Sequence, residues 1–212
     1  MGRHTCCGPC PISTEYKKWD KGRSTYDVPH RFIASFVYEL PFGRGKKYGA
    51  SINKAVDLVF GGWQTNGILS FAQGQFQTLN LGSDWILVGS FSRSIPQLVG
   101  DPFAGRTSPD RYWNAAAFDF PRDAQGNRLR VVGNAGRNTY QQPGLNNWDL
   151  SMFKNFRITE KFSTQFRWET FNSLNHTQFG NANTNTQSAT FGAITSTRVG
   201  ARRMQLGLKV LW

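Results

Sequence analysis

The sequence predicts an all-β fold of antiparallel strands, and two observations support this prediction. Apolar and polar side chains alternate over several segments of about ten residues, as in strands with one apolar and one wet face. The composition agrees, because a hydrophobic share of only 39% is combined with an aromatic share of 14% and 22 glycines. A sheet that is aromatic on one face and polar on the other would have this composition.

The first two strands are predicted at residues 31–40 and 59–73. In the first segment Phe32, Phe36 and Tyr38 share one face, and the sequence PFGRGKK at 41–47 then indicates a turn, because Pro and Gly break a β-ladder. Alternation resumes around Trp63 and Phe71, so the second segment is expected to return as the partner strand of a hairpin. A short segment at 75–81 is expected to continue the sheet.

The stretch from about 82 to 146 has no strand or helix period and is rich in Pro, Gly, Asp, Asn and Arg. Soluble domains rarely contain an irregular stretch of roughly sixty residues. Outer-membrane barrels have such stretches, because their outward loops are long and their periplasmic turns are short. The stretch is therefore predicted to be one long irregular loop.

Three further strands are predicted at 147–156, 162–171 and 202–212, with a tight connection at 159–161 and an Asn- and Thr-rich loop at 177–190. In 162–171, Phe166 and Trp168 alternate with Gln165, Arg167 and Glu169. Charged side chains are costly to bury in a dry core unless they are paired, whereas a water-filled lumen accepts them. The three polar residues are therefore predicted to face a lumen.

The end of the sequence forms one of its most regular strands, although chain ends in soluble proteins are commonly frayed and polar. Met204, Leu206, Leu208, Val210 and Trp212 share one face of this strand. Together the segments predict an antiparallel transmembrane β-barrel portion, the C-terminal strands of a larger barrel, with one long irregular loop. The expected location is the cell outer membrane.

Other classes of protein fit the sequence less well. No run approaches the roughly 18 to 20 apolar residues of a membrane-spanning helix, so a membrane role requires strands or a surface helix. An alternative is a soluble extracellular β-sandwich that binds carbohydrate, in which the apolar faces would pack against each other. The net charge of +12 raises nucleic acid or anionic lipid as a partner. The charges are scattered, however, so no nucleic-acid partner is expected; such a partner would require steeply salt-dependent binding.

Catalysis and metal binding are not expected. The three histidines lie in no recognisable nucleophile motif, and the cysteines near the start lack the second pair that zinc would need. Four loop aspartates are too irregularly spaced for a known calcium loop. The sequence thus predicts no enzyme, no metal and no cofactor. The histidines are His4, His30 and His176, the cysteines are Cys6, Cys7 and Cys10, and the loop aspartates are Asp101, Asp110, Asp119 and Asp123.

Ligand contact is predicted for a group of aromatic and basic residues in the long loop. Tyr112, Trp113 and Phe118 lie close in sequence to Arg106 and Arg111. Tryptophans in the strands are expected to belong to the aromatic girdles that barrels place at the membrane interfaces.

A series of short motifs resembles the C-terminal barrel region of the Oar-like TonB-dependent receptors of acidobacteria. The resemblance covers 27–212, and the order of the motifs makes it more specific than any one of them. The motifs are DVPHRF at 27–32, YELPFGRGK at 38–46, GGWQ at 61–64, GNAGRN at 133–138, PG at 143–144, NWDLS at 147–151 and FNSLNH at 171–176.

The resemblance implies a role in ligand uptake and a set of partners. In that family TonB acts on an N-terminal box and remodels a plug domain, and the ligands include siderophores, carbohydrates and peptides. The last strand resembles the signal by which the barrel-assembly machinery recognises its substrates, with Trp212 where Phe is usual. Outer-membrane lipid and that machinery are therefore expected partners.

The start of the sequence departs from the family. Residues 1–26 match it poorly and are expected to be a disordered leader. The family's signal peptide, carboxypeptidase-regulatory-like domain and plug find no counterpart, so the chain is expected to be a fragment that needs a missing N-terminal plug and barrel portion before it can transport.

Overall fold

The computed structural model describes residues 20–90, 93–106, 108–159 and 161–212. The chain divides into two compact units. The sheet unit comprises residues 30–72, 145–178 and 199–212, and the loop unit comprises 73–144, 179–198 and the described residues before 30. Within the described ranges, no helix is both long and apolar enough to cross a membrane.

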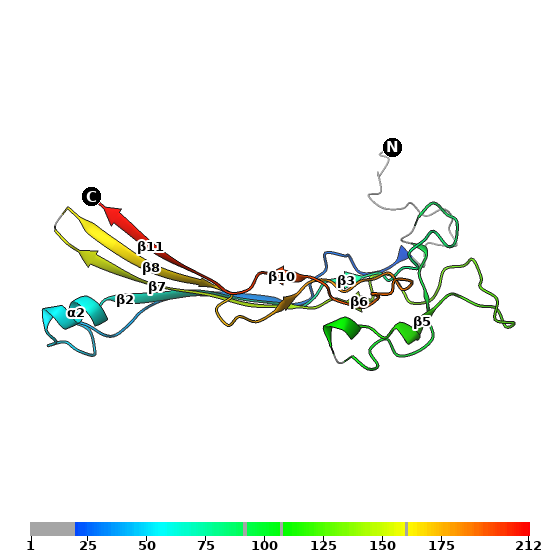
Figure 1. Ribbon diagram of the computed structural model, residues 1–212, viewed down its shortest axis with the longest axis horizontal. Helices are drawn as coiled ribbons and strands as arrows, with labels where there is room; N and C mark the ends of the chain where they lie inside the picture. The colour runs from blue at the N-terminus through cyan, green and yellow to red at the C-terminus, as the bar shows by residue number, and fades with distance from the viewer. Residues whose placement is uncertain (1–19, 91–92, 107, 160) are drawn as a thin grey trace. The chain divides into compact units, whose positions relative to one another are not determined.

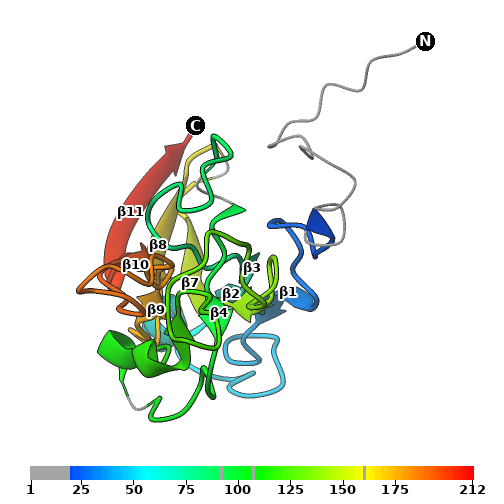
Figure 2. The same ribbon diagram turned by 90° about the vertical axis from the view of Figure 1, so that its right-hand side faces the viewer.

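The sheet unit is built on five antiparallel strands, β1 (Arg31–Glu39), β2 (Trp63–Ala72), β7 (Leu145–Arg157), β8 (Ser163–Phe171) and β11 (Arg203–Leu211). Their order in the sheet is β1-β2-β7-β8-β11. Among these five, each strand therefore pairs with the strands that come before and after it in the sequence. Figure 2 shows the strands side by side in this order. The predicted all-β antiparallel fold is confirmed.

The connection between β1 and β2, residues 40–62, contains the short helix α2 (Lys54–Phe60). Its N-cap is Asn53, whose side chain accepts a hydrogen bond from the backbone of Ala55 at 3.1 Å. The helix was not predicted from the sequence. Figure 1 shows α2 at the end of the sheet where the C-terminus also lies.

The loop unit contains mostly irregular backbone with short elements. The strands are β3 (Phe76–Gln77), β4 (Gln97–Leu98), β5 (Phe118–Asp119) and β6 (Tyr140–Gln141), and the 3-10 helices are η3 (Pro109–Arg111) and η4 (Ala115–Ala117). β3 pairs with β6 and β4 pairs with β5. Two more short strands, β9 (Gln178–Phe179) and β10 (Thr197–Val199), pair with each other.

The long irregular stretch has a hydrophobic core of its own. Trp113 is only 2% exposed, and its ring lies 5.9 Å from that of Phe191 and 6.1 Å from that of Tyr140, between centroids. Tyr112 and Gly192 are joined by a backbone hydrogen bond of 3.0 Å. The 73–144 and 179–198 segments therefore fold together around shared aromatic rings, which gives the loop a defined structure.

Ion pairs attach the described start of the chain to the loop unit. The Asp20 carboxylate lies 2.8 Å from the Arg93 guanidinium and 3.0 Å from that of Arg137. The Arg23 guanidinium lies 4.5 Å from the centroid of the Phe76 ring. The predicted boundary between a leader and the barrel region at residue 26 stays a prediction. Residues 1–19, which include His4 and the three cysteines, lie outside the described residues. Glu160, in the predicted tight connection at 159–161, also lies outside them.

Candidate functional site

The register of the sheet places apolar side chains of all five strands on one face. Residues paired directly across antiparallel strands lie on the same face of a sheet. Phe32 pairs with Phe71, Leu69 with Trp148, Met152 with Trp168 and Trp168 with Leu206. We call this surface the apolar face.

The apolar face is largely uncovered within the chain. Phe32, Leu206 and Leu208 are 61%, 72% and 70% exposed. Apolar side chains that face water at this density would be costly, because burying them contributes about 25 cal/mol per Å². A sandwich would cover this surface with a second sheet, and no second sheet lies on it among the described residues of the sheet unit.

The opposite surface, the polar face, carries side chains that hydrogen-bond across the strands. The three predicted lumen residues Gln165, Arg167 and Glu169 all lie on it, and Gln205 pairs with Glu169. The Gln165 amide donates to Asn155 Oδ1 at 2.7 Å, the Arg167 guanidinium donates to Gln165, and the Gln205 amide donates to Glu169. The guanidinium of Arg167 and the carboxylate of Glu169 are 4.0 Å apart.

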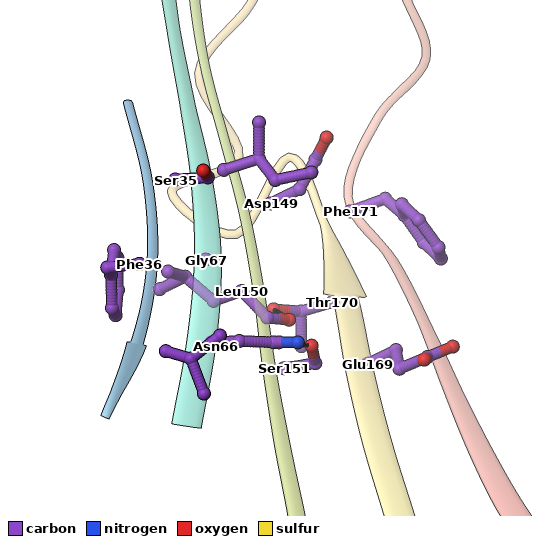
Figure 3. A pocket seen from close by; sticks show the side chains of 12 residues that line it. Ser35, Phe36, Asn66, Gly67, Asp149, Leu150, Ser151, Glu169, Thr170 and Phe171 are labelled. Carbon is purple, nitrogen blue, oxygen red and sulfur yellow. Dashed lines mark hydrogen bonds between the residues drawn. The ribbon is translucent and has the colours of Figure 1, made fainter. Parts of the chain in front are cut away.

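A hollow of about 310 Å³ opens over the middle of the sheet. Figure 3 shows the amide of Asn66 on β2 reaching toward Ser151 on β7, and Ser151 donates a hydrogen bond to it. Asp149 and Glu169 also line the hollow, and Asp149 Oδ1 accepts a hydrogen bond of 2.9 Å from the backbone of Asn172. Two carboxylates and a neutral amide–hydroxyl pair from three adjacent strands thus meet in a hollow whose other walls are largely apolar and include Val37, Ile68 and Phe171.

Sequence reasoning did not select Asn66, Ser151 or Asp149 as site residues. Each lies at a polar position of an alternating segment, which was the available signal. Only the register shows that they meet, because Asn66 pairs with Ser151 and Ser151 pairs with Glu169 across β2, β7 and β8.

An antiparallel sheet with one exposed apolar face and one hydrogen-bonded polar face has the organisation of a membrane-barrel wall. A family model described as an outer membrane beta barrel domain matches residues 7–205. The chain belongs to this family, and its location is the outer membrane. No match was found among curated proteins or among solved structures.

The predicted ligand-contact residues divide into two groups in the loop unit. Arg106 and Arg111 are exposed, whereas Tyr112, Trp113 and Phe118 are buried in the aromatic core. The Arg106 guanidinium lies 3.8 Å from the centroid of the Tyr112 ring, a cation–π arrangement that holds the cation at the surface of the core. Burial raises the pKa of the Tyr112 hydroxyl, and the neighbouring charge of Arg106 opposes that rise. Ligand contact by these residues stays a prediction.

Two of the loop aspartates already have partners within the protein. The Asp119 carboxylate lies 2.8 Å from the Arg122 guanidinium, and the Asp123 carboxylate accepts backbone hydrogen bonds from Gln125 and Asn127 at 3.0 and 2.7 Å. The hydrogen bond from Arg122 lowers the pKa of Asp119, and the hydrogen bonds from Asn127 lower the pKa of Asp123. These carboxylates fix turns of the loop, and in the described part of the chain no group of acidic, His and Cys residues has the arrangement of a metal site.

Proposed function

We propose that the chain forms part of the wall and an extracellular loop unit of a TonB-dependent receptor that takes up a nutrient ligand. The observation that carries the proposal is the polar face. Its Glu169 carboxylate accepts a hydrogen bond from Gln205 and lies 4.0 Å from the Arg167 guanidinium. No second sheet covers these side chains among the described residues of the sheet unit, which suits the lining of a water-filled passage. The ordered motifs between residues 27 and 212 support the receptor type.

The loop unit supports the ligand-capturing half of this proposal. Ligand-binding residues often lie on loops, because a rigid framework of strands or helices holds these variable segments in place. This unit has a packed aromatic core. The exposed Arg106 stacks on the Tyr112 ring of that core, and the exposed Arg111 is the last residue of the short helix η3. A loop with such a core can present these cations in a fixed geometry to an anionic or polar ligand.

The wall needs further strands. In the described sheet β1 and β11 are edge strands, and lipid does not tolerate unpaired backbone groups. We propose that a plug-bearing N-terminal portion supplies the remaining strands and the TonB contact. The chain is assigned no catalytic reaction, metal or cofactor of its own.

The test is energy-dependent uptake by cells of the parent organism. Cells that lack the chain and cells that express it again are compared for uptake of labelled siderophore, oligosaccharide and peptide probes. We expect uptake of one probe class to be lost, restored by the wild-type chain and abolished by a protonophore. Uptake of all three classes that is unaffected by both the deletion and the protonophore would overturn the proposal.

Sidedness provides a second test. The three cysteines are replaced by serine, and a single cysteine is introduced at Arg128 in the loop unit or at Ser51 in the 40–62 connection. Both positions are exposed. A membrane-impermeant maleimide should label R128C in intact cells and S51C only after the outer membrane is permeabilised. The reverse pattern would contradict the proposed orientation.

A further inference from the structure

A second hollow lies on the apolar face, where the 40–62 connection folds back against the sheet. Its volume is about 500 Å³ and its walls are almost entirely apolar. The connection contributes Phe42, Tyr48, Ile52, Val56 and Phe60. The sheet contributes Trp63 and Met152, which both lie on the apolar face.

The end of α2 is fastened to the sheet, so the hollow is a built feature of the unit. The Lys154 ammonium on β7 donates hydrogen bonds to the carbonyls of Asp57, at 3.1 Å, and Gly61. The Trp63 indole N–H donates to the Val59 carbonyl at 2.8 Å. The Val59 and Gly61 carbonyls lie where the end of a helix leaves carbonyls without intrahelical partners. The Asp57 carbonyl also accepts the backbone N–H of Gly61 at 2.8 Å.

The outer surface of the connection is apolar as well. Val56, Leu58, Val59 and Phe60 of α2 are 44%, 60%, 57% and 67% exposed. Because this surface continues the apolar face of an outer-membrane wall, its environment is lipid. A short helix with this exposure, beside a Trp and a Tyr, is typical of a segment at the membrane interface.

The connection that forms the wall of this hollow is also rich in basic residues, and Arg44 directly follows the lining residue Gly43. The connection carries Arg44, Lys46, Lys47 and Lys54 against the single acidic residue Asp57, whose carboxylate accepts the backbone N–H of Arg44 at 2.7 Å. Lys46 is paired with Glu39 at 2.7 Å, and the Lys47 ammonium lies 5.4 Å from the centroid of the Tyr48 ring. In the part of the chain that the structure describes, the side chains of Arg44 and Lys54 form no ion pair.

We propose that the hollow is a binding site for one anionic phospholipid of the periplasmic leaflet, with an acyl chain in the apolar hollow and the headgroup phosphate between Arg44 and Lys54. The site lies at the periplasmic end, because the connections at the opposite end of the sheet, 73–144 and 172–202, are longer. The headgroup must be anionic, because the connection carries four basic residues and one acidic residue. The site is independent of the proposed ligand uptake.

The experiment is native mass spectrometry of the full chain, recovered from the outer membrane in detergent. It is titrated with phosphatidylglycerol or with phosphatidylcholine of the same acyl chains. We expect one phosphatidylglycerol to bind per chain in preference to phosphatidylcholine. Each basic side chain near an anionic headgroup accounts for roughly a fivefold change in affinity. The double variant Arg44→Ala with Lys54→Ala should therefore bind phosphatidylglycerol roughly 25-fold more weakly.

Two further variants separate the hollow from general charge effects. Val56→Trp keeps every charge and fills the hollow, so it should weaken binding of both lipids. Lys161→Ala removes an exposed lysine from the other connection at the same end of the sheet and should bind as the wild type does. Far-UV circular dichroism checks that each variant keeps its strands.

Three outcomes would overturn the proposal. The first is equal binding of the two lipids by the wild type, and the second is unchanged binding by the double variant or by Val56→Trp. The third is a loss of phosphatidylglycerol binding in Lys161→Ala as large as that in the double variant. That result would show that net charge alone accounts for the weaker binding.

Discussion

Lys154 donates a hydrogen bond from its ammonium to the backbone carbonyl of Gly61, although the two residues are 93 positions apart in the sequence. Lys154 lies on the apolar face of β7 and is only 3% exposed. A buried ammonium is costly unless its donors are satisfied. The Lys154 ammonium also donates to the Asp57 carbonyl. These two hydrogen bonds, which we call the Lys154 clamp, join strand β7 to the 40–62 connection.

Replacing Lys154 with Met should loosen the 40–62 connection. The change removes hydrogen bonds from a charged donor, which contribute about 1.5–3 kcal/mol each, and leaves the carbonyls of Gly61 and Asp57 without that partner. Trypsin should then cleave faster at Arg44, Lys46 and Lys47. The matched control is Lys161→Met, at an exposed lysine, which should leave the cleavage rate unchanged. Equal cleavage of wild type and Lys154→Met would show that the clamp does not stabilise the connection.

Substitution of Gly67 should destabilise the middle of the sheet. A Cβ at this position would lie 2.6 Å from Phe36 Cε1 and 2.7 Å from Leu150 Cδ2, because both side chains close over the glycine from neighbouring strands. Overpacking of this kind typically costs about 1–3 kcal/mol. Gly67→Ala should therefore lower the denaturant midpoint in detergent.

Gly207 on β11 is the matched control for this effect. A Cβ at Gly207 would meet only the Cβ of Arg167, at 3.8 Å, which is an ordinary contact. Gly207→Ala should keep the wild-type midpoint. If both variants unfold alike, the effect belongs to glycine in strands generally and not to the contact with Phe36 and Leu150.

Local alternation predicted the five strands of the sheet, because each strand needs one apolar and one polar face whatever its partners are. The predicted 59–73 strand was wrong at its start, since residues 59 and 60 belong to α2, and the 75–81 segment does not continue the sheet, since β3 pairs with β6. The 31–40 and 162–171 segments were placed within one or two residues of β1 and β8. Alternation gives the face of a residue relative to its own strand. It does not give the register, which is why the meeting of Asn66, Ser151 and Glu169 was not predicted.

The parts that sequence reasoning missed depend on contacts between distant residues. Helix α2 has seven residues, too few for an amphipathic period, and Lys154 from another strand fastens its end. The aromatic core of the loop unit has no period either, because Trp113, Tyr140 and Phe191 come from separate irregular segments. Composition suggested loop aromatics for ligand contact, and only the fold shows that three of them are buried.

Removal of the Trp113 side chain should unfold the loop unit while the sheet persists. Trp113 packs against Tyr112, Tyr140 and Phe191, and a buried Trp→Ala change typically costs about 3–5 kcal/mol. Trp113→Ala should lose near-UV circular dichroism and become sensitive to protease in 73–144. The control is Phe103→Ala, since Phe103 is 46% exposed. A protease-resistant loop in Trp113→Ala would argue against a core role for this residue.

Acidic pH should weaken the loop unit through Asp119. The hydrogen bond from Arg122 lowers the pKa of the folded carboxyl below its ordinary value of 3.8. The stabilisation is therefore complete above that ordinary value and is lost as pH falls through the lower folded pKa. Thermal unfolding of the loop unit, followed by near-UV circular dichroism, should show a midpoint that drops below about pH 4.

Asp119→Asn should reduce this acid-dependent drop, because the variant cannot be protonated there. Asp110→Asn, at an exposed residue of η3, serves as the matched control and should keep the wild-type pH profile. A profile for Asp119→Asn that overlays the wild type would remove Asp119 as a source of the acid sensitivity.

Deletion of residues 208–212 should prevent assembly into the outer membrane. The deletion removes Leu208 and Val210 from the apolar face and the pairing partners of Phe166 and Thr164 on β8. Backbone groups left unpaired in lipid are costly, and the predicted recognition signal ends at Trp212. Behind an exported signal peptide, and in cells that also supply the proposed N-terminal portion, the wild type should fractionate with the outer membrane and the deletion variant should not. Trp212→Phe keeps a terminal aromatic and Lys209→Ala changes only the polar face, so both should assemble. Normal insertion of the deletion variant would show that the terminal strand carries no assembly signal, and failure of Lys209→Ala would place the signal outside the apolar positions.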